Sequence, residues 1–251
     1  MMPAMDAWLG SLLSWFALPQ FGLSTVFVVA FVSATLLPMG QLAAALGVAP
    51  GTATTMVKTL AESGLVEYEP YNGVRLTAAG TRLAVTVLRR HRLVELFLVQ
   101  VMGMRWDEVH DDAEHLEHVV SDRLLDRIDE MLGHPETDPH GDPIPGPEGT
   151  IRERHFETLL TCPLGTEVVV ARVSDQDPVF LRFVERHALK PGMRVTVDSR
   201  EEAADAVQLR AADGTAFTLG ARAASKLLVD VPGGAEAPVS RAAGRAATRR
   251  R

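Results

Sequence analysis

Residues 40–80, GQLAAALGVAPGTATTMVKTLAESGLVEYEPYNGVRLTAAG, decide the fold of this part of the chain. Two stretches with helical apolar patterns, over 39–47 and 52–63, predict two short helices joined by a turn. Residues 66–76 then read as two short strands around Asn72-Gly73, a dipeptide that strongly favours a tight hairpin turn. Two helices followed directly by a β-hairpin predict a winged helix-turn-helix.

The second predicted helix carries side chains that suit contact with DNA. A recognition helix presents short polar side chains to base edges at its N-terminal end, and threonine can hydrogen-bond a base or pack its methyl group on thymine. Lysine and arginine suit phosphate contacts, which position a protein on DNA but specify no sequence. The expected DNA-binding residues are Ala49, Gly51, Thr52, Thr54, Thr55, Lys58 and Arg75. The alternative is a small α/β module with no nucleic-acid role.

Two further helices, predicted over 77–100 and 106–133, carry possible metal ligands. Side chains at positions i, i+3 and i+4 of a helix share one face; three acidic or histidine residues of the second helix have this spacing, and two on the first are four apart. If the helices are antiparallel, carboxylates and imidazoles face each other, a donor set that suits Mn²⁺ or Fe²⁺. The alternative is a solvated acidic helix face. The candidate ligands are His91, Glu95, His110, Glu114, Glu117 and His118.

The remaining segments differ in composition from this central part. Residues 7–57 contain no Asp, Glu, Lys, Arg or His, and Phe21–Leu37 is a nearly apolar run of 17 residues. That length is at the lower limit for a membrane span, so a short membrane segment and a buried helix both stay open. Short β-type runs between 163 and 231, interrupted by one helix over Pro178–His187, predict a small barrel. The expected organisation is an apolar N-terminal segment (1–37), a winged helix (38–80), a helical domain (81–133), a Pro/Gly-rich linker (134–160), a barrel (161–231) and a disordered Arg-rich tail (232–251).

Charge and cysteine content narrow the class of protein. A formal net charge of −7 is unusual for a protein that contacts phosphates, unless some acidic residues are cation ligands; an ordinary acidic protein is the alternative. Cys162 is the only cysteine, which excludes an internal disulfide and a cysteine-based zinc site and fits the reducing cytoplasm. The sequence contains no nucleophile elbow, Walker loop, HExxH or Rossmann fingerprint, which argues against an enzyme.

Three stretches resemble the diphtheria-toxin-repressor family of metal-dependent regulators, in particular its manganese-responsive branch. They are the winged-helix stretch quoted above, LRRHRLVELFL (88–98) and DEVHDDAEHLEHVVSDRLLDRID (107–129), and GDPIPG (141–146) adds a family mark in the linker. The resemblance implies a mainly α-helical protein with a C-terminal β domain: a winged helix, a helical dimerisation and metal-binding domain, and an SH3-like barrel of the FeoA type.

The resemblance also carries over individual residues. The six candidate ligands match the family's ligand positions, and Glu114 stands where manganese-responsive members have Glu and iron-responsive members have Cys. A carboxylate is a harder ligand than a thiolate, which favours Mn²⁺ over Fe²⁺. Ligands from the barrel would fall near Asp175, Gln176 or Asp177. The expected protein is a homodimeric, cytoplasmic repressor of metal-homeostasis genes that binds a double-stranded DNA operator when Mn²⁺, or alternatively Fe²⁺, is bound.

The first 37 residues depart from the family pattern. Members begin with an amphipathic helix that donates one or two metal ligands, whereas this segment is nearly free of charge and, through SATLLP (33–38), resembles the start of a YqaA/DedA-type membrane protein. Asp6 is the only acidic residue before Glu62. The alternatives are therefore a regulator that associates with the membrane through residues 21–37 or an inactive fusion derivative. A metal-dependent hydrolase is less favoured.

Overall fold

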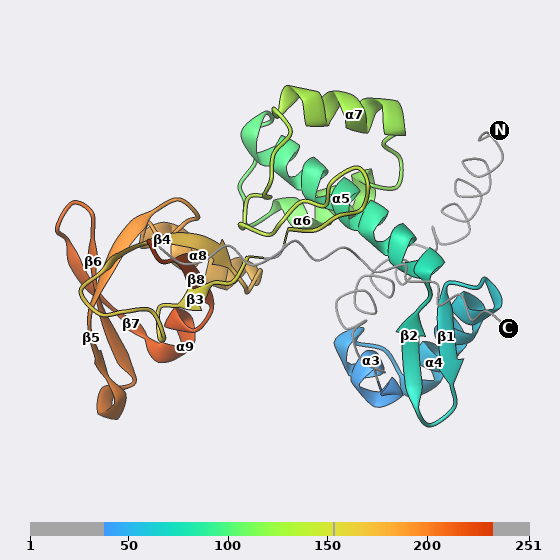
Figure 1. The fold of residues 1–251 in the computed structure, drawn as a ribbon, viewed down its shortest axis with the longest axis horizontal. Helices are drawn as coiled ribbons and strands as arrows, with labels where there is room; N and C mark the ends of the chain where they lie inside the picture. Colours follow the sequence, from blue (N-terminus) through green and yellow to red (C-terminus); the bar gives the residue numbers. More distant parts are fainter. Residues whose placement is uncertain (1–37, 153, 233–251) are drawn as a thin grey trace, which may run out of the picture.

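The computed structural model describes residues 38–152 and 154–232. The expectations for segment 1–37, including the membrane span at 21–37, and for the tail from residue 233 onward fall outside the described residues. Among the helices that are described, none is both long and apolar enough to cross a membrane. Figure 1 shows the winged helix at one end of a long helix, further helices around the other half of that helix, and the barrel beyond them.

The winged helix has the predicted order of elements. Its bounds are α3 (Met39–Ala45), α4 (Pro50–Glu62), β1 (Val66–Glu69) and β2 (Gly73–Leu76). Leu42, Val57 and Val74 are buried in one core that joins the helices to the hairpin. The strands pair antiparallel, with Glu69 opposite Gly73, so the hairpin predicted from Asn72-Gly73 is confirmed.

The long helix α5 (Ala78–Gln100) follows directly after strand β2 of the winged helix. Thr77 caps it, because the Thr77 hydroxyl accepts a hydrogen bond of 3.0 Å from the amide of Gly80. Gly80 packs so closely on the preceding turn that a Cβ atom there would lie 1.9 Å from the carbonyl oxygen of Leu65. This close approach fixes the start of α5 against the DNA-binding module.

The single helix predicted over 106–133 is wrong. The structure has two helices there, α6 (Val109–Leu116) and α7 (Asp122–Met131). Ser121 ends the continuity, because its side chain accepts a hydrogen bond from the amide of Leu124 and starts a new helix. Both helices pack on α5 in a core that includes Leu93, Val109 and Ile128.

The C-terminal part is a six-stranded antiparallel sheet in the order β3-β8-β4-β5-β6-β7. Buried valines and leucines on these strands form its core, which also takes in Trp106 from the helical part. The runs predicted from the sequence correspond to β4, β5, β6 and β8, whereas β3 and β7 were not predicted. The elements are β3 (Glu157–Thr158), β4 (Glu167–Val173), α8 (Pro178–Arg186), β5 (Arg194–Glu201), η1 (Glu202–Ala204), β6 (Ala206–Ala211), β7 (Ala216–Gly220), α9 (Ala221–Ala224) and β8 (Leu227–Asp230).

The segment 134–146, predicted as part of a linker, is packed between the helices and the barrel. Asp138, His140 and Asp142 are buried in it. The amide of Val173, in β4, donates to the carbonyl of His140 over 2.8 Å. Gly141 has a φ of +87°, and a Cβ atom there would lie 2.0 Å from the carbonyl oxygen of Ala171. The backbone of this segment therefore sits directly on strand β4.

Candidate metal centre

Three of the predicted ligands meet where α5 faces the start of α6. His91 Nε2 lies 3.0 Å from Glu95 Oε1, and His110 Nδ1 lies 3.2 Å from the same oxygen. The two imidazoles are 3.2 Å apart, between His91 Nε2 and His110 Nδ1. His91 and Glu95 are buried, and His110 is exposed. These three side chains, here called the helix group, are close enough together to hold one metal ion.

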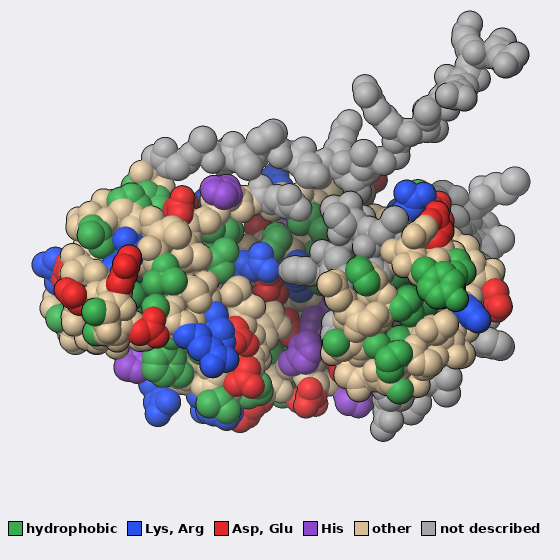
Figure 2. Space-filling view, turned by 90° about the horizontal axis from the view of Figure 1, so that it is seen from below, with side chains coloured by type: hydrophobic (Ala, Val, Ile, Leu, Met, Phe, Trp, Pro, Cys, Tyr) green, Lys and Arg blue, Asp and Glu red, His purple; other side chains and the backbone are tan. Residues whose placement is uncertain are grey.

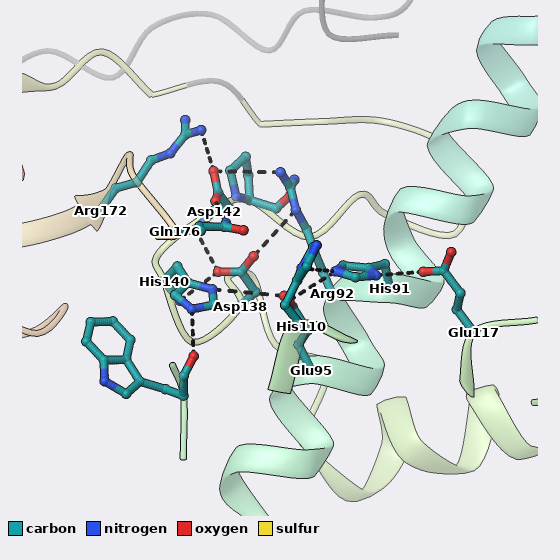
Figure 3. A network of polar contacts seen from close by, with 12 residues as sticks. His91, Arg92, Glu95, His110, Glu117, Asp138, His140, Asp142, Arg172 and Gln176 are labelled. Carbon is teal, nitrogen blue, oxygen red and sulfur yellow. Dashed lines mark hydrogen bonds and ion pairs between the residues drawn. The ribbon is translucent and has the colours of Figure 1, made fainter. Parts of the chain in front are cut away.

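A second set of possible ligands shares Glu95 with the helix group. It consists of Glu95, Asp138 and His140, all buried, and is here called the linker group. His140 Nδ1 and Asp138 Oδ2 are buried without a hydrogen-bond partner among the described residues. Buried polar atoms are rarely left unpaired, so these two atoms suit a bound cation. Figure 3 shows both groups joined through Glu95 in one polar network.

Sequence reasoning missed Asp138 and His140. The Pro/Gly-rich composition of 134–149 indicates a linker and gives no sign that its side chains are buried. A usable signal was the concentration of histidines between 110 and 140. Trp106 shapes this part of the site, because its ring stacks on His140 at 5.4 Å between centroids and its carbonyl lies 3.0 Å from His140 Nε2.

The other three predicted ligands follow the helix group along the chain. Glu117 is buried, and its Oε2 lies 2.7 Å from His91 Nδ1. His118 Nε2 lies 3.7 Å from Glu117 Oε1, and Glu114 is half-buried on α6. Among the described residues, neither group of clustered donor atoms includes these three side chains. The structure thus joins Glu117 to His91 but does not gather Glu114, Glu117 and His118 around one point.

The helix group has strongly perturbed protonation. Burial disfavours the charged form of His91, but hydrogen bonds to Glu117 and Glu95 outweigh it and raise the pKa of His91 to about 10. Burial also opposes ionisation of Glu95, yet hydrogen bonds from His110 and His91 hold the Glu95 pKa well below its usual range. The hydrogen bond to Glu95 raises the pKa of His110. In the metal-free protein the protonated imidazole of His91 therefore binds the carboxylates, and a metal cation could bind them in its place.

In the linker group the pKa of a carboxyl group is raised, whereas that of Glu95 is lowered. Burial, with the nearby charge of Asp142, raises the pKa of Asp138. Arg92 compensates only in part, with its Nε 3.5 Å from Asp138 Oδ2. A buried cluster of carboxylates with incomplete compensation favours the binding of a positive ion.

The three barrel positions expected near the metal site behave differently from one another. Gln176 Nε2 donates to Asp142 Oδ2 over 3.0 Å and so joins the network. Asp175 instead pairs with Lys226, and Asp177 caps α8 by accepting from the amides of Val179 and Phe180. Of the three, Gln176 is the one that the structure brings into this network.

The predicted DNA-binding residues lie on the surface of the winged helix. Six are exposed and Thr54 is half-buried. The hydroxyls of Thr54 and Thr55 donate to the carbonyls of Pro50 and Gly51, one turn earlier in α4. Arg75 Nε donates to Glu67 Oε2 over 2.6 Å, so a phosphate would compete with this carboxylate for Arg75.

Charged side chains of both signs lie on the face of the molecule that Figure 2 shows. Figure 2 shows acidic and basic side chains on both lobes of the molecule, with histidine side chains near the hollow between the lobes.

The donor set of the helix group and the linker group combines imidazole nitrogen with carboxylate oxygen, a combination that suits Mn²⁺ or Fe²⁺.

Comparisons with known proteins place each part of the chain. Residues 30–74 match the iron dependent repressor N-terminal DNA binding domain. Residues 77–146 match the iron dependent repressor metal binding and dimerisation domain, and residues 157–231 match the FeoA domain. The first match begins at residue 30, inside the nearly apolar segment 1–37.

Similar whole proteins agree with these domain matches. The iron-dependent repressor IdeR of Mycobacterium leprae is 32% identical over 161 residues, which cover 59% of this chain and 70% of the relative. The diphtheria toxin repressor of Corynebacterium glutamicum is 38% identical over 95 residues, 38% of this chain and 42% of the relative. A solved manganese-dependent transcriptional repressor in complex with manganese is 41% identical, with a TM-score of 0.73 over 82% of this chain and 97% of the other. With its winged helix, helical domain and SH3-like FeoA barrel, the chain belongs to the diphtheria-toxin-repressor family of metal-dependent transcriptional regulators.

Proposed function

We propose that this protein is a transcriptional repressor that binds operator DNA as a homodimer when Mn²⁺ is bound, with Fe²⁺ as the alternative ion. The observation that carries this proposal is the convergence of two donor groups on Glu95 of α5, the helix that grows out of the winged helix. We place its action in the cytoplasm, on genes of metal homeostasis.

The helix and linker groups are the first candidates to hold the ion, and Glu114, Glu117 and His118 stay predicted ligands beside them. When bound, the ion would supply a compact positive charge and directed bonds to imidazole and carboxylate. Without it, His91 carries a proton and lies in hydrogen-bond contact with the carboxyl groups of Glu95 and Glu117. The junction of α5, α6 and segment 134–146 can therefore exist in two states, one with a bound cation and one with a proton on His91.

Coupling to DNA follows from how α5 is attached. Thr77 and Gly80 fix the start of α5 to the winged helix, and His91 and Glu95 lie further along the same helix. A change that orders α5, α6 and segment 134–146 also orders the two recognition helices of a dimer, which must reach successive major grooves about 34 Å apart. The ion then favours the DNA-competent state without touching DNA.

Burial of the linker group argues against a hydrolytic metal site there. Glu95, Asp138 and His140 are at most 5% exposed, whereas a hydrolytic metal site keeps an open coordination position for water or substrate. The membrane-associated alternative depends on residues 21–37, and cell fractionation tests it: recovery of the protein with the membrane pellet would support that alternative.

The decisive experiment is selection of DNA by the purified full chain. The protein is mixed with a pool of random DNA duplexes, with either Mn²⁺ or a chelator, and the retained duplexes are sequenced. We expect one enriched palindromic site with Mn²⁺ and none with chelator. Enrichment that does not depend on Mn²⁺ or Fe²⁺ would remove the metal-activated mechanism.

A further inference from the structure

The break between α6 and α7 contains two predicted ligands, Glu117 and His118. The last carbonyls of an α-helix have no partner inside the helix, and the C-cap of α6 is Glu117 itself. A segment of this kind holds its side chains in place only if other groups satisfy its carbonyls and fix its path.

Arg90 supplies these groups from α5. Its Nε donates to the carbonyl of Glu117 over 3.1 Å. Its two terminal nitrogens donate to the carbonyl of Val120 and to the carboxylate of Asp122 at the start of α7. One guanidinium thus binds the end of α6, the connecting turn and the start of α7.

The chemistry of arginine fits this position. The guanidinium is planar, always charged, and presents several donors in a fixed fork. A cation is also favourable beside the C-terminal carbonyls of a helix. Arg90 is only 8% exposed, and a buried charge is retained only when its donors are satisfied.

His91, the next residue on α5, contacts the side chain of Glu117. His91 Nδ1 lies 2.7 Å from Glu117 Oε2, so Arg90 fixes the backbone of Glu117 while His91 contacts its side chain. We propose that Arg90 is a positioning residue that presents Glu117 and His118 for metal binding without being a ligand itself. This inference rests on the proposed function, because it concerns the metal of that function.

The test is a calorimetric titration of the full chain with Mn²⁺. We expect Arg90→Gln to weaken Mn²⁺ binding tenfold or more and to increase hydrogen exchange at the amides of 117–121. Arg90→Lys keeps the charge but not the fork, so we expect a smaller loss of affinity and a similar increase in exchange. This variant carries the test if Arg90→Gln does not fold.

Arg89→Gln is the matched control. Arg89 is the preceding residue on α5 and is also largely buried, but it binds Asp129 in α7 and the carbonyl of Pro145. We expect exchange at 117–121 to stay at the wild-type level in this variant. An equal increase there, or wild-type Mn²⁺ affinity in both Arg90 variants, would overturn the inference alone. A wild-type chain that binds no Mn²⁺ would overturn the proposed function together with it.

Discussion

At the scale of single residues, the imidazole of His91 decides how the centre responds to pH. It lies between Glu95 and Glu117, and these carboxylates keep it protonated at neutral pH. A metal ligand must be a neutral imidazole, so a cation that takes this position releases a proton. In the metal-free protein the raised pKa contributes stability that is fully present below about pH 6.5 and is lost as the pH rises through about 10.

This competition gives the first prediction. We expect the apparent Mn²⁺ affinity to rise between pH 6 and 8, by about tenfold per pH unit for one displaced proton. Calorimetry in two buffers of different ionisation enthalpy measures both the affinity and the number of protons released. A flat profile with no proton release would mean that His91 does not bind the ion.

Glu95 gives a second prediction at the same scale. It is 1% exposed and belongs to both donor groups, so Glu95→Gln removes a carboxylate that both groups need. We expect the Mn²⁺ affinity to fall by about tenfold or more, measured by the same titration. Glu108→Gln, an exposed residue next to α6, is the control and should keep wild-type affinity. Equal affinity in the two variants would exclude Glu95 as a ligand.

At the scale of elements, α4 carries most of the predicted DNA-binding residues, and α5 carries two of the predicted metal ligands, His91 and Glu95. α4 places Thr52, Thr55 and Lys58 on the exposed side of the winged helix, while Val57 and Leu60 face its core. α5 contributes to the core of the winged helix at its start and to the metal centre further along. One helix therefore belongs both to the winged-helix core and to the candidate metal centre.

Lys58 provides the prediction for the DNA-binding surface. If it contacts a phosphate, Lys58→Ala removes one counterion-releasing contact, so the slope of log K against log salt should become smaller by about 1. Fluorescence anisotropy with the selected operator at several salt concentrations measures this slope. Arg194→Ala, on the barrel strand β5, is the control and should leave the slope unchanged. An unchanged slope for Lys58→Ala would remove this residue from the interface.

At the scale of the whole molecule, the barrel and the helical part share one packed interface. Trp106 lies in the barrel core, and Arg182 of α8 binds Asp107 over 3.0 Å. Asp142 pairs with Arg172 of β4 and accepts from Gln176. The barrel therefore holds in place the segment that carries Asp138 and His140 (Figure 3).

Gly141 tests this coupling. In Gly141→Ala the new Cβ would lie 2.0 Å from the carbonyl of Ala171, so the barrel and segment 138–142 must separate. We expect a loss of stability of about 2 kcal/mol or more, weaker Mn²⁺ binding and faster proteolysis between helices and barrel. Thermal unfolding, calorimetry and limited digestion measure the three effects.

Gly214→Ala is the matched control. Gly214 has nearly the same φ, +86°, but open space around its Cβ position, so the variant has the backbone strain without the clash. We expect it to lose some stability and to keep Mn²⁺ affinity. If the two variants bind Mn²⁺ equally well, the barrel does not support the linker group.

Local patterns in the sequence determined a large part of this protein. The winged helix follows from two short amphipathic stretches and the Asn72-Gly73 turn, and the cap of α5 follows from Thr77. The pairing of His91 with Glu95 follows from helical periodicity, since the two residues are four positions apart and so lie on the same face of α5. Features of this kind depend on neighbours a few residues apart, so the sequence alone can specify them.

Only the tertiary structure decided which distant residues meet. Asp138 and His140 join Glu95 because Gly141 brings the backbone of their segment onto β4. Glu117 meets His91 at the end of α6, where Arg90 binds the Glu117 carbonyl. The composition of 134–146 indicates a linker, yet its side chains are buried by contacts with residues more than thirty positions away. Such contacts depend on packing between elements, which residue type and spacing do not encode, and so the ligand positions were partly predictable while the shared centre around Glu95 was not.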